Sequence, residues 1–254
     1  MSVSHEIRDG IAVITMDDDA RRNTLSRRQV RGMLEAIAAS DEARAIVIAA
    51  RGKVYSAGAD LSDFGGEGGV MDESAKDSPM ALFETLIAEP RIVIAAVHAG
   101  AYGGGFELTL CCDLVAAAQE AFFMLPETAH GVMPPIAAAR LPSIIGTRRT
   151  LELIATRRKL PATEAHALGL VNRLSEPGQA LEAALALAHE VVDAAPPASL
   201  AAAKHGIADR IPELTPVLTS TLARLDEREW KEGMRAFAEK RKADYAPIWK
   251  TRRR

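Results

Sequence analysis

Two glutamates are the residues of this sequence best suited to acid–base chemistry. Glu107 ends the stretch "AYGGGFE" (101–107), and Glu127 stands in "MLPETAHG" (124–131). Glu127 follows an apolar run and a proline, a setting in which desolvation raises the pKa of a carboxyl group. Their spacing in the sequence does not show that the two carboxyl groups lie close together. An acidic residue in a first helical turn and a solvated loop glutamate are the ordinary alternatives.

Three consecutive glycines (103–105) precede Glu107. Ordered glycine runs usually serve a close approach of two backbones, or of a backbone and a ligand. If a helix begins near Gly104, then Gly104, Glu107, Leu108 and Cys111 share one face. A backbone N–H group and a carboxylate would then border the same small volume. Tight packing of a helix on a strand is the alternative explanation of the glycines.

Two loops rich in small residues follow two predicted buried strands. They are "YSAGAD" (55–60) and "AGAYGGGFE" (99–107). In open α/β sheets ligands gather beyond the carboxyl ends of the strands, where both loops belong. Neither loop matches the P-loop pattern or G-x-G-x-x-G, so the sequence does not predict a nucleotide cofactor.

The cysteines and histidines do not suggest a metal or nucleophile site. Cys111 and Cys112 are adjacent and lie in an apolar stretch, which is typical of small buried hydrophobic residues. The six histidines are scattered. We therefore interpret each of them, including His98 in a predicted buried strand and His130 near Glu127, as structural or exposed.

The pattern of apolar residues predicts an α/β fold with mainly parallel strand pairing. A helix is expected after Ser26, which is a plausible N-cap, and 62–78 is expected to be a long surface loop. Strands are predicted at 10–16, 43–51, 91–100 and 170–175, with one or two more within 113–125.

From about residue 135 the sequence is mostly helical in character. Pro196 and Pro197 mark the best candidate boundary. We therefore predict an α/β body over 1–195 and a helical region over 196–254.

Composition and charge limit the classes of function that we expect for this protein. The chain has 254 residues, 48% of them hydrophobic and 26% charged, with a formal net charge of −3 and a pI near 6.1. This balance is that of an ordinary globular protein and gives no electrostatic reason to expect nucleic acid. No long apolar run and no signal peptide are visible, so we expect no membrane association and a cytoplasmic location.

Three segments together carry a resemblance to a known family. "YSAGADLSDF", "AYGGGFELTLCCDL" and "FFMLPETAHGVMP" resemble the crotonase superfamily of acyl-CoA enzymes, specifically enoyl-CoA hydratases. The likeness extends over nearly the whole chain, from "GIAVITMDDDARRNTLS" to "EGMRAFAEKRKADY". It implies a spiral of repeated ββα units, with a C-terminal helical region that builds homotrimers or homohexamers.

The resemblance also implies roles for particular residues. Ala59 and Gly104 would form an oxyanion hole for a thioester carbonyl, Glu107 would activate water, and Glu127 would protonate the α-carbon. The CoA thioester would be the substrate, with no separate cofactor. Coenzyme A would be bound by Arg21, Arg22, Thr24, Ala57, Ala59, Asp60, Leu61 and Ser62. The acyl pocket would be lined by Phe64, Leu125, Met133 and Pro134.

One segment departs from the family pattern. Many hydratases continue with "GGTQRL" after the second glutamate, whereas this chain has "GVMPPIAAARL" (131–141). The difference leaves the acyl group open. An enoyl-CoA isomerase or another crotonase-type reaction is the alternative to hydration, since one glutamate suffices to move a proton. A non-catalytic acyl-CoA-binding or RNA-binding relative is the alternative of a different class.

Overall fold

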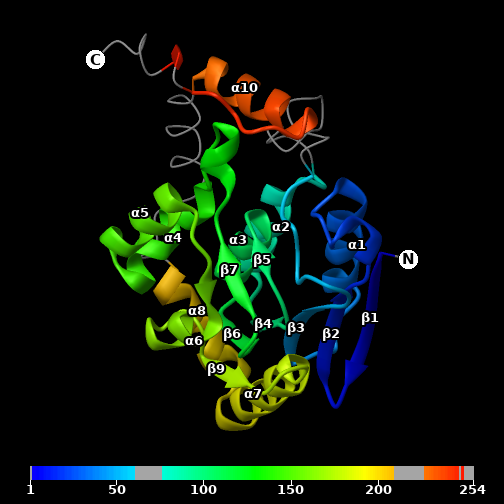
Figure 1. Ribbon diagram of the computed structural model, residues 1–254. Helices are drawn as coiled ribbons and strands as arrows, with labels where there is room; N and C mark the ends of the chain where they lie inside the picture. The colour runs from blue at the N-terminus through cyan, green and yellow to red at the C-terminus, as the bar shows by residue number, and fades with distance from the viewer. Residues whose placement is uncertain (1, 61–75, 209–225, 246, 249–254) are drawn as a thin grey trace.

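The computed structural model describes residues 2–60, 76–208, 226–245 and 247–248 (Figure 1). Its main sheet has six strands in the order β1-β2-β3-β4-β6-β9. Only the β1–β2 pair is antiparallel, so the predicted α/β fold with mainly parallel pairing is confirmed. The strands are β1 Val3–Arg8, β2 Ile11–Met16, β3 Ala45–Ala50, β4 Ile92–Val97, β6 Leu114–Ala118 and β9 Arg173–Ser175.

Both faces of this sheet are covered, which explains the continuous apolar runs of its strands. In β2, Ile14 belongs to the larger core cluster, which includes residues of α1 (Arg27–Ala38), whereas Val13 belongs to a second cluster on the opposite face. Helix α7 (Ala180–Ala194) covers that second face (Figure 1). Alternate side chains of each strand therefore enter different cores.

A second sheet of three strands has the order β5-β7-β8. Its strands are β5 Ala101–Tyr102, β7 Phe122–Met124 and β8 Leu160–Pro161. The segment 113–125 therefore contains two strands, β6 and β7, one in each sheet. A strand of the main sheet, a strand of the small sheet and a helix follow one another twice, as β4-β5-α3 and as β6-β7-α4. This repetition is the ββα spiral that the resemblance predicted.

The first helices begin where side chains cap them. Ser26 accepts a hydrogen bond from the backbone N–H of Gln29 at the start of α1, as expected. Ser78 caps α2 (Pro79–Ala88) in the same way, with proline at the first helical position. The sequence analysis missed α2. Most of the predicted 62–78 loop lies outside the described residues.

The later part of the chain is helical, as predicted from about residue 135. Two strand predictions were too long, because β9 begins only at Arg173 and β4 ends at Val97, one residue before the half-buried His98. The remaining helices are α3 Gly104–Cys111, α4 Pro135–Ile145, α5 Thr147–Thr156, α6 Ala162–Ala167, α8 Pro197–Ala208 and α10 Glu227–Ala238.

The proposed boundary at 195/196 coincides with the start of α8, but α8 packs on the α/β body. Lys204 in α8 forms an ion pair with Asp113, with 2.8 Å between Nζ and Oδ2. Helix α10 lies at the far end of the molecule in Figure 1, where it contacts the short 3-10 helix η3 (Glu127–His130). The division into two regions stays a prediction.

Candidate active site

Helix α3 begins at Gly104, so Gly104 and Glu107 share a face as predicted. Each glycine before Glu107 has its own close neighbour. A Cβ atom at Gly103 would lie 2.9 Å from Oε1 of Glu127, and one at Gly105 would lie 2.6 Å from Cβ of Ser56. Gly103 also has φ +52°. Close packing within the protein therefore requires at least Gly103 and Gly105, but against Glu127 and the loop residue Ser56 rather than against a strand.

The two predicted oxyanion-hole residues lie side by side. A Cβ atom at Gly104 would lie 3.2 Å from the backbone nitrogen of Ala59. The loop before Ala59 is held against β5 by a bridge between Ser56 and Ala101. Within the described part of the chain, neither the Ala59 N–H nor the Gly104 N–H donates a hydrogen bond. Two adjacent backbone donors are therefore available to an oxygen atom.

The turn "RRNT" (21–24) is tied to the same loop by a buried asparagine. The side-chain Nδ2 of Asn23 donates to the carbonyls of Arg51 (2.8 Å) and Val54 (3.1 Å). The Ser56 hydroxyl donates to the Asn23 carbonyl at 2.7 Å. The Ala57 N–H donates to the Arg22 carbonyl at 2.9 Å. These hydrogen bonds hold the turn 21–24 and the loop 55–60 next to each other.

Glu107 is buried, with 4% of its surface exposed. Its Oε1 accepts a hydrogen bond of 3.0 Å from the Ala137 N–H at the start of α4, and the Ile136 N–H also interacts with the carboxyl group. Burial raises the pKa of Glu107 to about 7, while these two donors favour the ionised form. The sequence analysis missed this use of the helix N-terminus, although Pro134 and Pro135 are a signal for it.

Glu127 opens η3, and its Oε2 is buried without a hydrogen-bond partner among the described residues. Burial, followed by the charge of Glu107, raises the pKa of Glu127 well above its usual value. The structure therefore brings the two glutamates into electrostatic contact, which their spacing alone did not show. Glu107 has two backbone donors from α4, whereas Glu127 has only its own N–H, and its Oε2 has no partner among the described residues. Glu127 is therefore the carboxyl group that keeps its proton when one proton is shared.

The C-terminal part of the chain supports the Glu127 segment. A Cβ atom at Gly233 of α10 would overlap the backbone carbonyl of His130. The Tyr245 hydroxyl donates to the Ala129 carbonyl at 2.7 Å, and the Phe237 ring meets the His130 ring edge to face at 5.5 Å. No sequence pattern indicated that residues about a hundred positions later would hold η3.

The predicted CoA-binding and acyl-pocket residues lie partly within the described residues. Leu61, Ser62 and Phe64 lie outside the described residues. Among the described CoA residues, Arg21 and Arg22 are exposed, and Thr24, Ala57, Ala59 and Asp60 are half-buried on the paired turn and loop. Among the acyl-pocket residues, Leu125 and Pro134 are buried and Met133 is half-buried.

Metal and thiol chemistry find little support among the described residues. No cluster of three or more potential metal-ligating side chains occurs there. Cys111 and Cys112 are free and buried, and burial raises the pKa of both thiols, as expected for structural residues. No helix in the described ranges is long and apolar enough to cross a membrane.

Comparisons with known proteins show the family of this chain. Residues 6–247 match the family described as enoyl-CoA hydratase/isomerase. The chain is 37% identical over 253 residues to the human enoyl-CoA hydratase domain-containing protein 2, covering 91% of this chain and 84% of that protein. An enoyl-CoA hydratase structure from Mycobacterium avium subsp. paratuberculosis superposes with a TM-score of 0.80 at 26% identity, covering 97% and 99% of the two chains. A methylmalonyl-CoA decarboxylase in complex with 2-nitronate-propionyl-CoA superposes with a TM-score of 0.84 at 25% identity, covering 97% and 98%.

Proposed function

This chain belongs to the enoyl-CoA hydratase/isomerase family, and from that premise we propose that it adds water to a 2-trans-enoyl-CoA. The product is a 3-hydroxyacyl-CoA formed by syn addition. The observation that carries the proposal is the pair Glu107 and Glu127, in which Glu107 accepts from two N–H groups of α4 while the buried Oε2 of Glu127 has no partner among the described residues. Two coupled carboxyl groups in unequal surroundings suit a reaction that needs one base and one acid.

In the proposed reaction Glu107 is the base. Its ionised carboxylate takes a proton from water as the water oxygen bonds to the β-carbon. The π electrons of the double bond move toward the thioester carbonyl and give an enolate. Glu127 then delivers its proton to the α-carbon, and the cycle closes when Glu107 loses its proton and Glu127 regains one, either directly or by exchange with solvent. General acid–base groups of this kind contribute roughly 10²–10⁴-fold each.

The enolate oxygen is proposed to sit between the Ala59 and Gly104 N–H groups. These donors are held in place by the backbone before the substrate binds, since the Leu25 N–H donates to the Gly58 carbonyl at 2.8 Å and the Gly103 N–H donates to the Met124 carbonyl at 2.9 Å. A rigid pair of donors needs little reorganisation as charge develops on the oxygen. One such donor is typically worth about 3–4 kcal/mol of transition-state stabilisation.

Coenzyme A is proposed to lie along the paired turn and loop. The exposed Arg21 and Arg22 could meet its phosphates, and the carbonyls of Thr24, Ala57 and Ala59 could accept from the adenine. Leu125, Met133 and Pro134 are proposed to line the acyl pocket. The assembly of the chain into homotrimers or homohexamers is a further prediction, which light scattering tests directly.

Hydration is favoured over isomerisation because both carboxyl groups are present and coupled. A reaction that only moves a proton needs one of them. Decarboxylation of an acyl-CoA would require an additional carboxylate close to the buried pair. Such a substrate would suffer charge repulsion from ionised Glu107.

The test follows loss of the conjugated enoyl-thioester absorbance of crotonyl-CoA. We expect wild type to consume the substrate, and Glu107→Gln and Glu127→Gln each to lose roughly 10²-fold or more in kcat. Glu42→Gln, which changes an exposed glutamate with the same chemistry, is the matched control and should retain full activity.

A wild-type enzyme inactive on a panel of 2-enoyl-CoA substrates of different chain lengths would contradict the proposal. Activity on 3-enoyl-CoA substrates alone would establish isomerisation instead. If wild type hydrates crotonyl-CoA and neither glutamine variant is impaired, the assigned roles of Glu107 and Glu127 are wrong.

A further inference from the structure

A cavity lies at the other end of α3 from the glycine run. It has a volume of about 470 Å³, and its lining includes residues of α3, α4, α7 and α8. Neither Glu107 nor Glu127 lines it, although α3 carries Glu107 and the first turn of α4 binds the Glu107 carboxylate. Cavities of this size are typical of small-molecule sites.

Most of the cavity wall is apolar. Ile87, Ile92, Leu114, Val191 and Leu200 contribute aliphatic surface. A ligand that replaces water against these side chains gains about 25 cal/mol for each Å² of apolar area buried. The wall therefore favours an aliphatic group over a sugar or a nucleotide.

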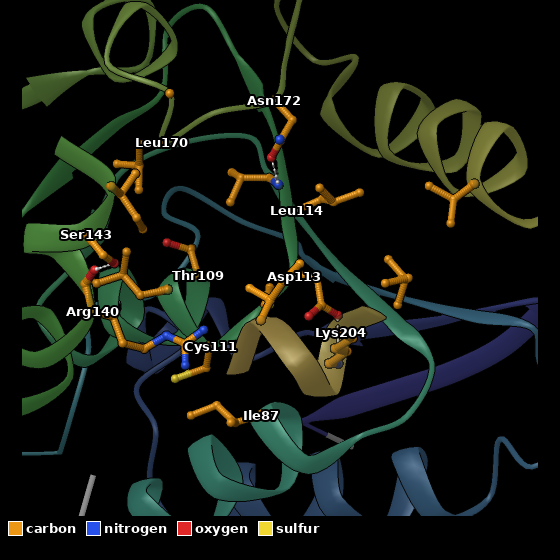
Figure 2. A pocket seen from close by; sticks show the side chains of 18 of the residues that line it. Ile87, Thr109, Cys111, Asp113, Leu114, Arg140, Ser143, Leu170, Asn172 and Lys204 are labelled. Carbon is orange, nitrogen blue, oxygen red and sulfur yellow. Dashed lines mark hydrogen bonds and ion pairs between the residues drawn. The ribbon is translucent and has the colours of Figure 1, made fainter. Parts of the chain in front are cut away.

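The polar side chains that line the cavity already have protein partners, with one exception. Thr109 and Ser143 donate to carbonyls of their own helices, and Oδ1 of Asn172 accepts from the Val115 N–H at 2.8 Å. Lys204 and Asp113 form an ion pair, as Figure 2 shows.

The exception is Arg140. Its side chain runs from α4 toward Cys111, and the guanidinium group is drawn within the cavity in Figure 2. Its Nε is buried, and no acceptor among the described residues takes a hydrogen bond from the guanidinium group. Arg140 is half-buried, and a buried N–H donor such as its Nε is unfavourable until an acceptor reaches it.

The charges lining the cavity select a monoanion. Asp113 is occupied, because its Oδ2 accepts from both Lys204 Nζ and the Val93 N–H, each at 2.8 Å. Lys204 also donates to the Arg91 carbonyl at 3.1 Å. One positive charge therefore remains, that of Arg140. A guanidinium group matches a carboxylate with two parallel hydrogen bonds.

We propose that this cavity binds a small aliphatic monocarboxylate, with the carboxylate on Arg140 and the chain against the aliphatic wall. The proposal does not rest on the hydratase reaction, because the site contains neither glutamate. It also differs from acyl-CoA binding, since the ligand is a free acid and the cavity is lined by neither the turn 21–24 nor the loop 55–60.

Hexanoate is the probe, with hexanol as the uncharged control and acetate as the control without a chain. Binding is measured by calorimetry on the full-length protein. It is located by NMR of labelled isoleucine methyl groups, since Ile87, Ile92 and Ile144 line the cavity. We expect hexanoate to bind and to shift these methyl signals. Hexanol and acetate should each bind about tenfold more weakly or worse.

Arg140→Met removes the charge and keeps most of the side-chain volume, so hexanoate binding should fall by about tenfold or more. Arg140→Lys should restore part of it. Arg148→Met changes an exposed arginine on α5 and should leave binding unchanged. If Arg140→Met does not fold, Ala203→Phe narrows the cavity from its outer wall and should weaken binding with Arg140 intact.

Three results would overturn the proposal. One is the absence of hexanoate binding to the folded wild type. Another is equal binding of hexanoate and hexanol, or of hexanoate to wild type and Arg140→Met. The third is a shift of methyl signals away from the cavity, which would place the bound acid elsewhere. All of these readouts measure binding, so an inactive enzyme would not affect them.

Discussion

The backbone N–H of Ala137 donates a 3.0 Å hydrogen bond to Oε1 of Glu107. This bond joins the first turn of α4 to the first turn of α3. The two helices begin at Pro135 and Gly104, 31 positions apart in the sequence. It gives a buried carboxylate the donors that a helix N-terminus leaves free. Glu127 has no such donor on its buried Oε2. The difference between the two glutamates therefore comes from α4.

The pH dependence of activity should reflect that difference. Glu107 must be ionised to take a proton, and its pKa is raised to about 7. Glu127 must be protonated, and its pKa is raised further by burial and by Glu107. We expect kcat/KM to rise with pH through about 7 and to fall at a higher pH, with both apparent pKa values belonging to the pair. A value of kcat/KM that stays constant from about pH 5 to 9 would contradict the assignment.

The stability of the protein should also depend on Glu107. A glutamate releases its proton near 4.5 when unfolded and at about 7 in the folded protein. Folding therefore takes up a proton between these values, and the free energy of unfolding decreases as pH rises from 4.5 to about 7. Glu107→Gln removes this loss and should gain stability relative to wild type, by up to about 3 kcal/mol above pH 7.

Urea unfolding at several pH values measures this effect. The control is Glu42→Gln, whose stability should follow the wild-type curve because Glu42 is exposed. A constant difference between Glu107→Gln and wild type at every pH would show that Glu107 does not titrate as described.

Gly58 keeps the two oxyanion donors together. It has φ +87°, and a Cβ atom there would lie 2.9 Å from the Gly104 nitrogen and 2.7 Å from the Tyr102 carbonyl oxygen. We expect Gly58→Ala to displace the Gly104 N–H and to lower kcat by roughly 10²-fold or more. Steady-state kinetics on the folded variant measure this change.

Gly146→Ala is the matched control for Gly58→Ala. Gly146 has φ +85° but no neighbour within 4 Å of an added Cβ atom. Both variants should lose about 1–3 kcal/mol of stability, because an alanine rarely adopts these positive φ values. Only Gly58→Ala should lose catalytic activity as well. Equal activity in the two would show that the contact with Gly104 has no catalytic consequence.

Gly233 should be a positioning residue for Glu127. An added Cβ atom would overlap the His130 carbonyl, so Gly233→Ala should push α10 away from η3. Misplacement of a catalytic group by about 1 Å can cost 10²-fold in rate. We expect kcat to fall while KM for the CoA thioester changes little, because η3 carries Glu127 and none of the predicted CoA-binding residues.

The control is Gly206→Ala in α8, where an added Cβ atom has no neighbour within 4 Å. It should keep full activity and gain up to about 1 kcal/mol in stability from helix propensity. Tyr245→Phe removes only the hydrogen bond to the Ala129 carbonyl and should show a smaller loss of kcat. Normal kcat in Gly233→Ala would exclude a positioning role for α10.

The sequence by itself determined most of the elements, though not the strands β1, β5 and β8, and it indicated the two glutamates as candidates for acid–base chemistry. Continuous apolar runs such as 91–100 predicted buried parallel strands, because a strand covered on both faces needs no polar alternation. The start of α3 at Gly104 and the shared face of Gly104 and Glu107 followed from local rules. Helix α2 was missed, because a capping serine and Pro79 at its start were absorbed into the predicted loop 62–78.

The tertiary structure alone decided how these residues act on one another. Burial and the donors of α4 set the pKa of Glu107, and η3 with α10 places Glu127, through contacts between segments far apart in the sequence. Hydrogen bonds and charges act over a few ångströms in space, whereas sequence spacing reports only local geometry along the chain. The pairing of the glutamates, and the lack of a hydrogen-bond partner for Nε of Arg140 among the described residues, are therefore properties of the folded chain.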